Sequence, residues 1–199
     1  MTVSNIVNQG VYNFLTLNGA GILFLGLLIL INFFIKDINN KEGTSVNKFF
    51  VNIVCIYLVL IITLYPIQGD KYVYSIMIED ISKLDFLSLI YSNTDILFAY
   101  YVKIIMFVTS SSFWVFLCTA IIYVFSYRYF CYKVIPSSAG FLFLTFISFF
   151  SFFSYGVNTL RAGLAAAILL VALSKIKNKQ TSALYFISTI LMHKSFILP

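Results

Sequence analysis

Apolar residues gather along this chain in long runs that are separated by short polar segments. A helix of about 20 apolar residues crosses the hydrocarbon core of a bilayer, and several runs approach that length. They lack the strict alternation of apolar and polar residues that a membrane-spanning barrel requires. We therefore predict an all-α, polytopic integral membrane protein with about six transmembrane helices. The predicted spans are Leu17–Ile35, Phe49–Tyr65, Ser110–Tyr127, Phe141–Gly156, Asn158–Ser174 and Ser182–Leu198.

A further apolar stretch, Ile96–Val108, is too short to cross a bilayer comfortably as a helix. The composition agrees with a membrane protein, because 61% of the residues are hydrophobic and 10% are charged. A soluble domain carries about 25% charged residues. No internal repeat and no low-complexity linker divides the sequence, so we predict one domain over residues 1–199.

The loop charges predict the orientation of the spans. Basic residues concentrate in the segments KDINNKEGTSVNK, RYFCYK and KIKNK, whereas residues 66–95 are acidic. Because Lys and Arg favour the cytoplasmic side, residues 66–95 are expected outside. This arrangement requires a single crossing within residues 96–127, so we interpret Ile96–Val108 as a re-entrant or interfacial helix. Six crossings with both termini outside follow.

The net charge of +6 does not indicate a nucleic-acid partner. Membrane orientation accounts for the basic residues, and no soluble module carries a basic face with interleaved aromatic residues. The three cysteines, Cys55, Cys118 and Cys131, lack the spacing of metal ligands. We interpret them as small apolar residues and expect neither a metal nor another cofactor.

Arg161 stands at the head of an apolar run, in NTLRAGLAAAILL. We expect Asn158 to cap this helix, which puts Arg161 one turn inside it. A helix N-terminus is already partly positive, so a cation there is unfavourable unless an anion joins it. Free N–H groups beside a guanidinium suit a phosphate or a carboxylate. The alternative is that Arg161 snorkels to the membrane surface.

Three other polar residues are candidates for the same site. Asp70 follows directly on the second span, and His193, the single histidine, lies near the outer end of the last run. Their simpler interpretations are a solvated loop aspartate and a hydrogen-bonded core histidine. Because Asp70, His193 and Arg161 are all expected at one face, we predict that they converge. Lys103, within Ile96–Val108, is expected to face a wet cavity or headgroups.

Four short motifs, GDKYVY, TDILFAYY, NTLRAGLAAAI and HKS, occur in this order along the chain. Together they resemble the EpsG-like family of bacterial polysaccharide polymerases, which are relatives of the Wzy-type O-antigen and capsule polymerases. The resemblance covers about residues 15–199. Members of this family usually continue for several more helices, so we expect this chain to be the N-terminal part of a longer polymerase.

Arg161 matches the arginine of the family pattern N-x-x-R-x-x-x-A, with Asn158 and Ala165 in register. Ala162 stands where the family often has glutamine, which is a departure from the pattern. The other matches are Asp70 with Tyr72, for an aspartate–tyrosine pattern after the second helix, and His193 with Ser195, for the H-x-S pattern.

The resemblance implies a glycosyltransferase of the bacterial cytoplasmic (inner) membrane whose active face is periplasmic or extracellular. Such enzymes join lipid-linked oligosaccharide repeat units into O-antigen of lipopolysaccharide, capsule or exopolysaccharide. Undecaprenyl pyrophosphate is the leaving group. Membrane lipids, a flippase and a chain-length regulator are the implied partners.

The same resemblance assigns roles to the candidate residues. Arg161 is expected to hold the donor pyrophosphate, because a fixed guanidinium stabilises the departing charge in the transition state. Asp70 or His193 would take the proton of the acceptor hydroxyl, and the sequence leaves both open. The other residues assigned to substrate binding are Asn158, Tyr72 and Lys103.

Two other classes of protein remain as alternatives. A transporter or flippase of lipid-linked sugars also holds charges in a helix bundle, but its inverted repeats and broken helices leave a sequence signature. That signature is missing, since Pro66, Pro136 and Pro199 all lie at the ends of apolar runs. A non-enzymatic membrane assembly subunit stays open, because the chain stops close to His193.

Overall fold

The structure is a computed structural model that describes residues 44–91 and 95–197, and these ranges contain helices and no strand. The all-α prediction is confirmed for this part of the chain, and the predicted span Leu17–Ile35 lies outside it. The α-helices are α2 (Thr44–Leu64), α3 (Asp70–Lys83), α4 (Ile96–Val108), α5 (Ser112–Val134), α6 (Ala139–Ser148), α7 (Phe150–Val157), α8 (Leu160–Ser174) and α9 (Lys179–Met192). The 3₁₀ turns are η1 (Ser88–Tyr91), η2 (Pro136–Ser138) and η3 (Lys194–Ile197).

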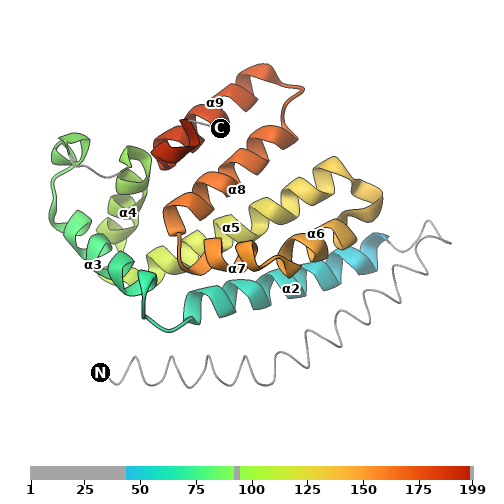
Figure 1. The fold of residues 1–199 in the computed structure, drawn as a ribbon, viewed down its shortest axis with the longest axis horizontal. Coiled ribbons are helices and arrows are strands. Elements are labelled where there is room, and N and C mark those ends of the chain that lie inside the picture. The colour runs from blue at the N-terminus through green and yellow to red at the C-terminus, as the bar shows by residue number, and fades with distance from the viewer. Residues whose placement is uncertain (1–43, 92–94, 198–199) are drawn as a thin grey trace.

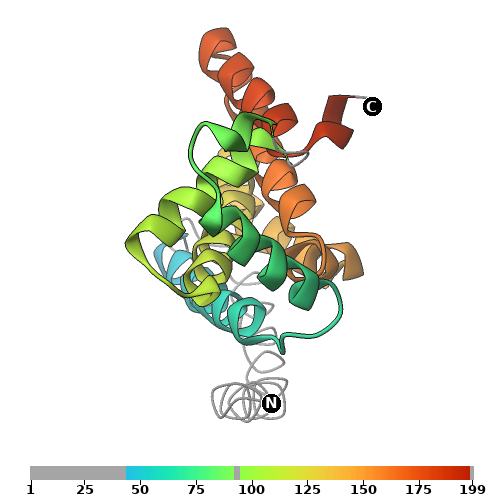
Figure 2. The same cartoon turned by 90° about the vertical axis from the view of Figure 1, so that its left-hand side faces the viewer.

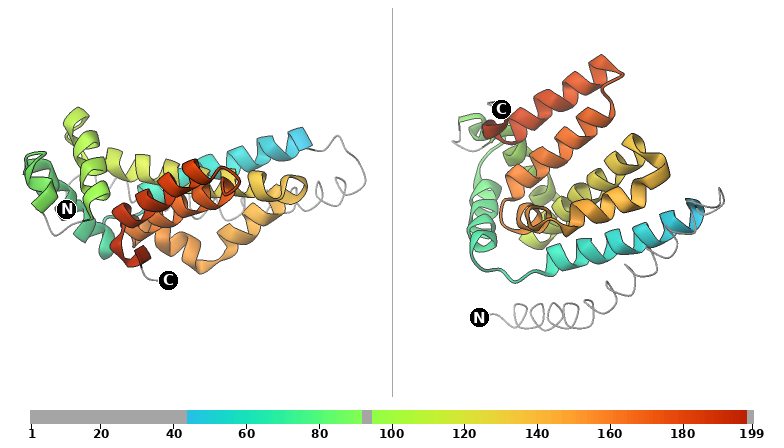
Figure 3. Two further views of the ribbon diagram at one scale, coloured as in Figure 1. Left: turned by 90° about the horizontal axis from the view of Figure 1, so that it is seen from above. Right: turned by 45° about the vertical axis from the view of Figure 1, so that its right-hand side comes forward.

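Four of the helices lie side by side in a row (Figure 1). In this row α5 packs between α2 and α8, and α9 packs on the other side of α8. The shorter helices α6 and α7 pack against α5 and α2. The pair α3 and α4 closes one end of the row and faces the viewer in Figure 2. Seen from above, the row is shallow (Figure 3, left).

The central helix α5 is the clearest candidate for a membrane span. Its 23 residues cover about 35 Å at 1.5 Å per residue, which exceeds the roughly 30 Å hydrocarbon core. In the described part of the chain it alone passes as a single straight span by length and hydropathy. The pair Pro136–Ser148 and Phe150–Val157 would make a second if it forms one broken span. The count of six crossings stays a prediction.

The helix α4 has the bounds that the sequence predicts for it, Ile96–Val108. Its 13 residues cover about 20 Å, which is well short of the hydrocarbon core. In the view from above, α4 stands across the direction of α5 instead of running beside it (Figure 3, left). This geometry is compatible with a re-entrant or interfacial helix.

The predicted span Phe141–Gly156 is not one helix, which corrects the sequence-based expectation. The chain bends by 70° at Phe149, where α6 ends and α7 begins. The side chains of Thr145 and Ser148 both donate hydrogen bonds to carbonyls four residues earlier, at 3.0 and 2.7 Å. Hydroxyls that bond back in this way compete with the backbone ladder and bend helices.

Two apolar clusters hold the row together. The first joins α2, α5, α6 and α7 around Tyr123, which is buried and donates a hydrogen bond from its hydroxyl to the carbonyl of Phe152 at 2.8 Å. The second joins α3, α4 and α8 to the start of α5 and the end of α9, and includes Phe98 and Leu164. The second cluster lies under the candidate site and fixes the helices that build it.

Candidate functional site

Asp95 is the residue from which the site is built. It immediately precedes α4, and its backbone carbonyl accepts the first helical hydrogen bond from the Ala99 amide at 2.9 Å. Its carboxylate does not cap its own helix. Buried Phe98 and Val102 hold α4 in the second apolar cluster, and Asp95 itself is 4% exposed. A buried carboxylate needs partners, because its desolvation is costly.

Arg161 supplies the first partner. Its Nη1 donates to Oδ2 of Asp95 at 3.1 Å. Arg161 is the second residue of α8, which begins just after α7 in a tight turn. The two helices approach so closely that a Cβ on Gly163 would clash with the carbonyl oxygen of Tyr155. The glycine thus allows the approach that brings the head of α8 to its position.

The guanidinium of Arg161 is not fully used by this ion pair. Its side chain is 31% exposed. The guanidinium makes one hydrogen bond to the described residues, the bond from Nη1 to Asp95. The Nε atom of Arg161 and the hydroxyl of neighbouring Thr159 are buried, and neither has a partner in the described part of the chain. Buried polar groups are normally hydrogen-bonded, so these two atoms are exceptions at the head of α8.

His193 and Lys194 supply the other partners from the end of α9. His193 ends that helix in an extended conformation, and its Nδ1 lies 2.9 Å from Oδ2 of Asp95. The backbone N–H of Lys194 donates to Oδ1 at 3.1 Å. The sequence predicts a helix over Ser182–Leu198, but α9 ends at Met192, and this early end turns the imidazole toward α4.

The hydrogen bonds determine the protonation of the cluster. Burial raises the pKa of Asp95, but the hydrogen bonds from His193 and the Lys194 amide and the charge of Arg161 outweigh it, so this pKa lies below its usual value. Asp95 is therefore ionised at neutral pH and only accepts hydrogen bonds. Nδ1 of His193 then donates its hydrogen to Oδ2 of Asp95, and Nε2 is the ring nitrogen that Asp95 does not contact. The ring is 25% exposed.

Three residues were predicted to converge. The structure brings Arg161 and His193 together, and Asp70 is not part of their cluster. Asp70 is the exposed first residue of α3 and makes no hydrogen bond or ion pair with any described residue. The carboxylate that joins the other two is Asp95. The sequence offered one signal for it, the motif TDILFAYY, but an aspartate before a helix is a common cap and received no role there.

In the motif GDKY, the buried residue is Lys71 and not Asp70. Lys71 is buried, and its Nζ donates to the carbonyls of Ile62, Thr63 and Tyr65 at 3.2, 2.7 and 2.7 Å. These carbonyls end α2, so the lysine caps that helix and complements its dipole. Sequence analysis missed this role. Tyr72, the next residue, is 56% exposed and lies away from the Asp95 cluster, along a groove on α3.

The remaining predicted residues have structural contacts of their own. Lys103 is half-buried, and its Nζ donates to the carbonyl of Ser82 near the end of α3 at 2.7 Å. Asn158 does not cap α8, which corrects the prediction. The backbone N–H of Asn158 instead donates to the carbonyl of Ser154 at 2.8 Å, at the end of α7. Thr159 precedes α8 without a side-chain cap.

The described residues contain no group of three His, Cys, Asp or Glu side chains with the geometry of a metal site. What they do contain is a guanidinium, a carboxylate and an imidazole in contact, at the ends of three helices of an apolar bundle. This arrangement can bind an anion through Arg161 and accept a proton at His193.

Over the described residues, these features define a helical bundle with a polar cluster between helix ends. Residues 65–198, about two thirds of the sequence, match the EpsG family. The chain belongs to this family, and it is a membrane protein of polysaccharide biosynthesis. The matched segment includes Asp95, Arg161 and His193. Comparison with curated proteins and with solved structures finds no match to this chain.

Proposed function

We propose that this protein is a glycosyltransferase that joins lipid-linked oligosaccharide repeat units on the outer face of the cytoplasmic membrane. The observation that carries the proposal is that Arg161 and His193 share one oxygen of Asp95. A single buried carboxylate thereby links a group that binds anions to a group that accepts protons. Transfer from a lipid pyrophosphate needs both of these groups.

His193 acts as the general base in this proposal. The acceptor sugar hydroxyl attacks the anomeric carbon of the donor, and its proton passes to Nε2 of His193. Asp95 holds the hydrogen on Nδ1, orients the ring and stabilises the imidazolium that forms, so it is a positioning residue. Exposed Asp70 lacks such support, since no described cation or donor contacts it.

Arg161 binds the leaving group. As the new glycosidic bond forms, the bond between the anomeric carbon and the pyrophosphate oxygen breaks, and the lipid pyrophosphate departs as an anion. The side chain of Arg161 is 31% exposed, and its guanidinium has further N–H donors beside the one that Asp95 uses, which can bind phosphate oxygens. We infer that undecaprenyl pyrophosphate is this lipid, in line with the family to which the chain belongs.

The charge balance of the cluster supports coupling between the two roles. The charges of ionised Asp95 and Arg161 cancel, and the role of general base requires that the ring of His193 is neutral before reaction. When His193 takes the proton, the cluster becomes net positive, while negative charge develops on the leaving pyrophosphate. The attraction therefore grows during the reaction, which lowers the energy of the transition state more than that of the bound substrate.

The experiment is reconstitution of the purified protein in liposomes with the lipid-linked repeat unit of its own host. We expect a ladder of polymer and the release of one lipid pyrophosphate for each linkage formed. A transporter would move the repeat unit between leaflets and leave the pyrophosphate bond intact. An assembly subunit would do neither, so either result would contradict the proposal.

A further inference from the structure

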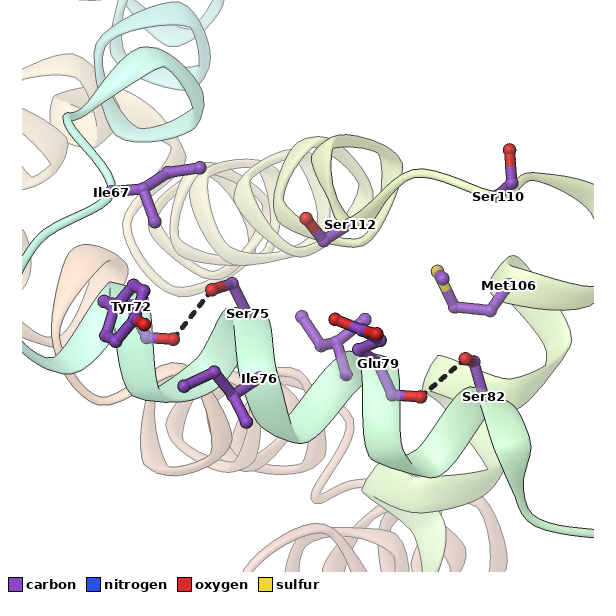
Figure 4. A pocket seen from close by; sticks show the side chains of 10 residues that line it. Ile67, Tyr72, Ser75, Ile76, Glu79, Ser82, Met106, Ser110 and Ser112 are labelled. Carbon is purple, nitrogen blue, oxygen red and sulfur yellow. Dashed lines mark hydrogen bonds between the residues drawn. The ribbon is translucent and has the colours of Figure 1, made fainter. Parts of the chain in front are cut away.

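A groove of about 910 Å³ runs beside α3, between this helix and the segment that joins α4 to α5 (Figure 4). Its volume lies in the range of small-molecule binding sites. One wall is α3, and the opposite wall is formed by the end of α4 and the start of α5 (Figure 4). The polar lining residues are Tyr72, Ser75, Glu79, Ser82, Ser110 and Ser112.

The polar lining consists of five hydroxyl groups and one carboxylate. Among the described residues, no lysine, arginine or histidine belongs to this lining, so the lining itself offers no cation to a phosphate. The remaining lining residues are three isoleucines and a methionine. Hydroxyls and a carboxylate beside apolar carbon and an exposed tyrosine ring match a sugar, whose ring has polar edges and apolar faces.

Some of the serine hydroxyls in the groove already make hydrogen bonds within the protein, and others do not. Ser75 and Ser82 donate to carbonyls of α3 at 2.7 and 2.6 Å, which leaves their lone pairs as acceptors. Ser110 and Ser112 have no hydrogen-bond partner among the described residues. Glu79 pairs with Lys83 at 2.9 Å in an exposed ion pair, and its carboxylate keeps lone pairs for a ligand.

The groove and the Asp95 cluster lie at opposite ends of one helix. Asp95 precedes the first turn of α4, and Met106 of its last turn lines the groove. Eleven residue steps at 1.5 Å place these ends about 17 Å apart along the helix axis. Lys103 links α4 to α3, because its Nζ donates to the carbonyl of Ser82 in the groove wall. A short oligosaccharide is long enough to connect the two places.

We infer that this groove is a binding site for the neutral saccharide part of the substrate, separate from the phosphate-binding role of Arg161. The choice of ligand rests on the proposed function, whereas the lining chemistry is independent of it. The predicted substrate-binding residue Tyr72 belongs to this saccharide groove instead of to the Asp95 cluster.

The probe is the free oligosaccharide released by mild acid from the host's lipid-linked repeat unit, which carries no phosphate. Its binding to the full chain in lipid nanodiscs is followed by saturation-transfer NMR. Wild type should bind it saturably, and the double variant Ser110→Ala with Ser112→Ala should bind about ten- to thirtyfold more weakly, as expected for two lost neutral hydrogen bonds. Glu79→Gln should also weaken binding.

Two controls make the test specific. The double variant Ser148→Ala with Ser151→Ala removes two exposed serines from α6 and α7 and should bind like wild type. Lys133→Gln, at the exposed end of α5, should also bind this probe like wild type. Absence of binding to wild type, equal binding by the groove variant, or equal loss in either control would overturn the inference.

The outcome is distinguishable from failure of the proposed function. Saturable, groove-dependent binding without polymer formation would leave the saccharide groove standing and refute the polymerase. Polymer formation that is unaffected by the groove variants, together with unchanged binding, would refute the saccharide groove alone.

Discussion

Arg161 and His193 contact the same carboxylate oxygen, Oδ2 of Asp95, at 3.1 and 2.9 Å. The two residues are 32 positions apart in sequence and come from the start of α8 and the end of α9, which pack together. Since one atom serves both, a change in either residue alters the electrostatic surroundings of the other. The predictions for this cluster depend on that sharing.

Arg161→Lys should reduce polymer formation by about ten- to a hundredfold while the protein still inserts in the membrane. Lysine keeps the charge but loses the planar fork that grips two phosphate oxygens, at a cost of about 1.5–3 kcal/mol. The measurement is polymer length on gels beside protein level by immunoblot. The control is Arg128→Lys in α5, which should polymerise normally. Normal polymer with Arg161→Lys would instead support the simpler role of snorkelling.

His193→Gln should lower kcat by about 10²–10⁴, because glutamine keeps a hydrogen bond to Asp95 but cannot take a proton. Asp70→Asn should leave kcat within about threefold of wild type, because exposed Asp70 has no contact with the cluster. The comparison of the two variants decides which residue is the base. Loss of activity with Asp70→Asn and not with His193→Gln would reverse our assignment.

Asp95→Asn should abolish most activity and also lower stability. If the amide oxygen takes the place of Oδ2, the NH2 group faces the N–H of Lys194, so two donors oppose each other, and the guanidinium of Arg161 loses its counter-charge. Because the folded-state pKa of Asp95 is lowered, its stabilising effect is present at neutral pH and is lost as pH falls below about 4. Thermal unfolding in detergent should show a wild-type advantage at pH 7 that shrinks toward pH 3. An advantage that does not depend on pH would contradict the ionised carboxylate.

Lys71→Met should destabilise the fold by about 3 kcal/mol, because three carbonyls at the end of α2 lose their hydrogen-bond donor. The measurement is the unfolding midpoint in detergent. Lys103→Met is the matched comparison, since Lys103 is half-buried and bonds one carbonyl, and it should cost about 1 kcal/mol. Equal effects of the two changes would mean that the three-carbonyl cap adds nothing.

The orientation of the chain is testable with single cysteines. Cysteine at exposed Asp80, in α3, should react with an impermeant thiol reagent on intact spheroplasts. Cysteine at exposed Lys177, in the basic segment before α9, should react only after the membrane is permeabilised. Wild type, whose Cys55 and Cys131 are buried, is the background control. Reaction at both positions, or the reverse pattern, would contradict the predicted topology.

The sequence predicted those features that depend on local patterns. The bounds of α4 follow from an apolar run between polar neighbours, and the apolar composition predicted a helical bundle. The bend at Phe149 could not be predicted from Pro or Gly, because neither occurs there, and it involves side-chain hydroxyls that bond back to the helix.

The identity of the central carboxylate depends on contacts between distant residues. Asp95 meets Arg161 and His193 across 66 and 98 positions of sequence, so no local spacing connects them. From the sequence, Asp70 after the second span was as good a candidate as Asp95 for the carboxylate beside Arg161 and His193. Only the packing of α4 against α3 and α9 distinguishes the two aspartates.

The burial of Lys71 also changes the electric field around the segment 66–95. By sequence this segment holds five carboxyl groups and two lysines, but Lys71 and Asp95 are both enclosed. The exposed charges of this segment are therefore four carboxylates and the single ammonium of Lys83. The carboxylates are those of Asp70, Glu79, Asp80 and Asp85. Over a Debye length of about 8 Å at physiological ionic strength, such a surface repels polyanions. An acidic glycan would approach this face more readily as salt increases, whereas a neutral glycan would be indifferent to it.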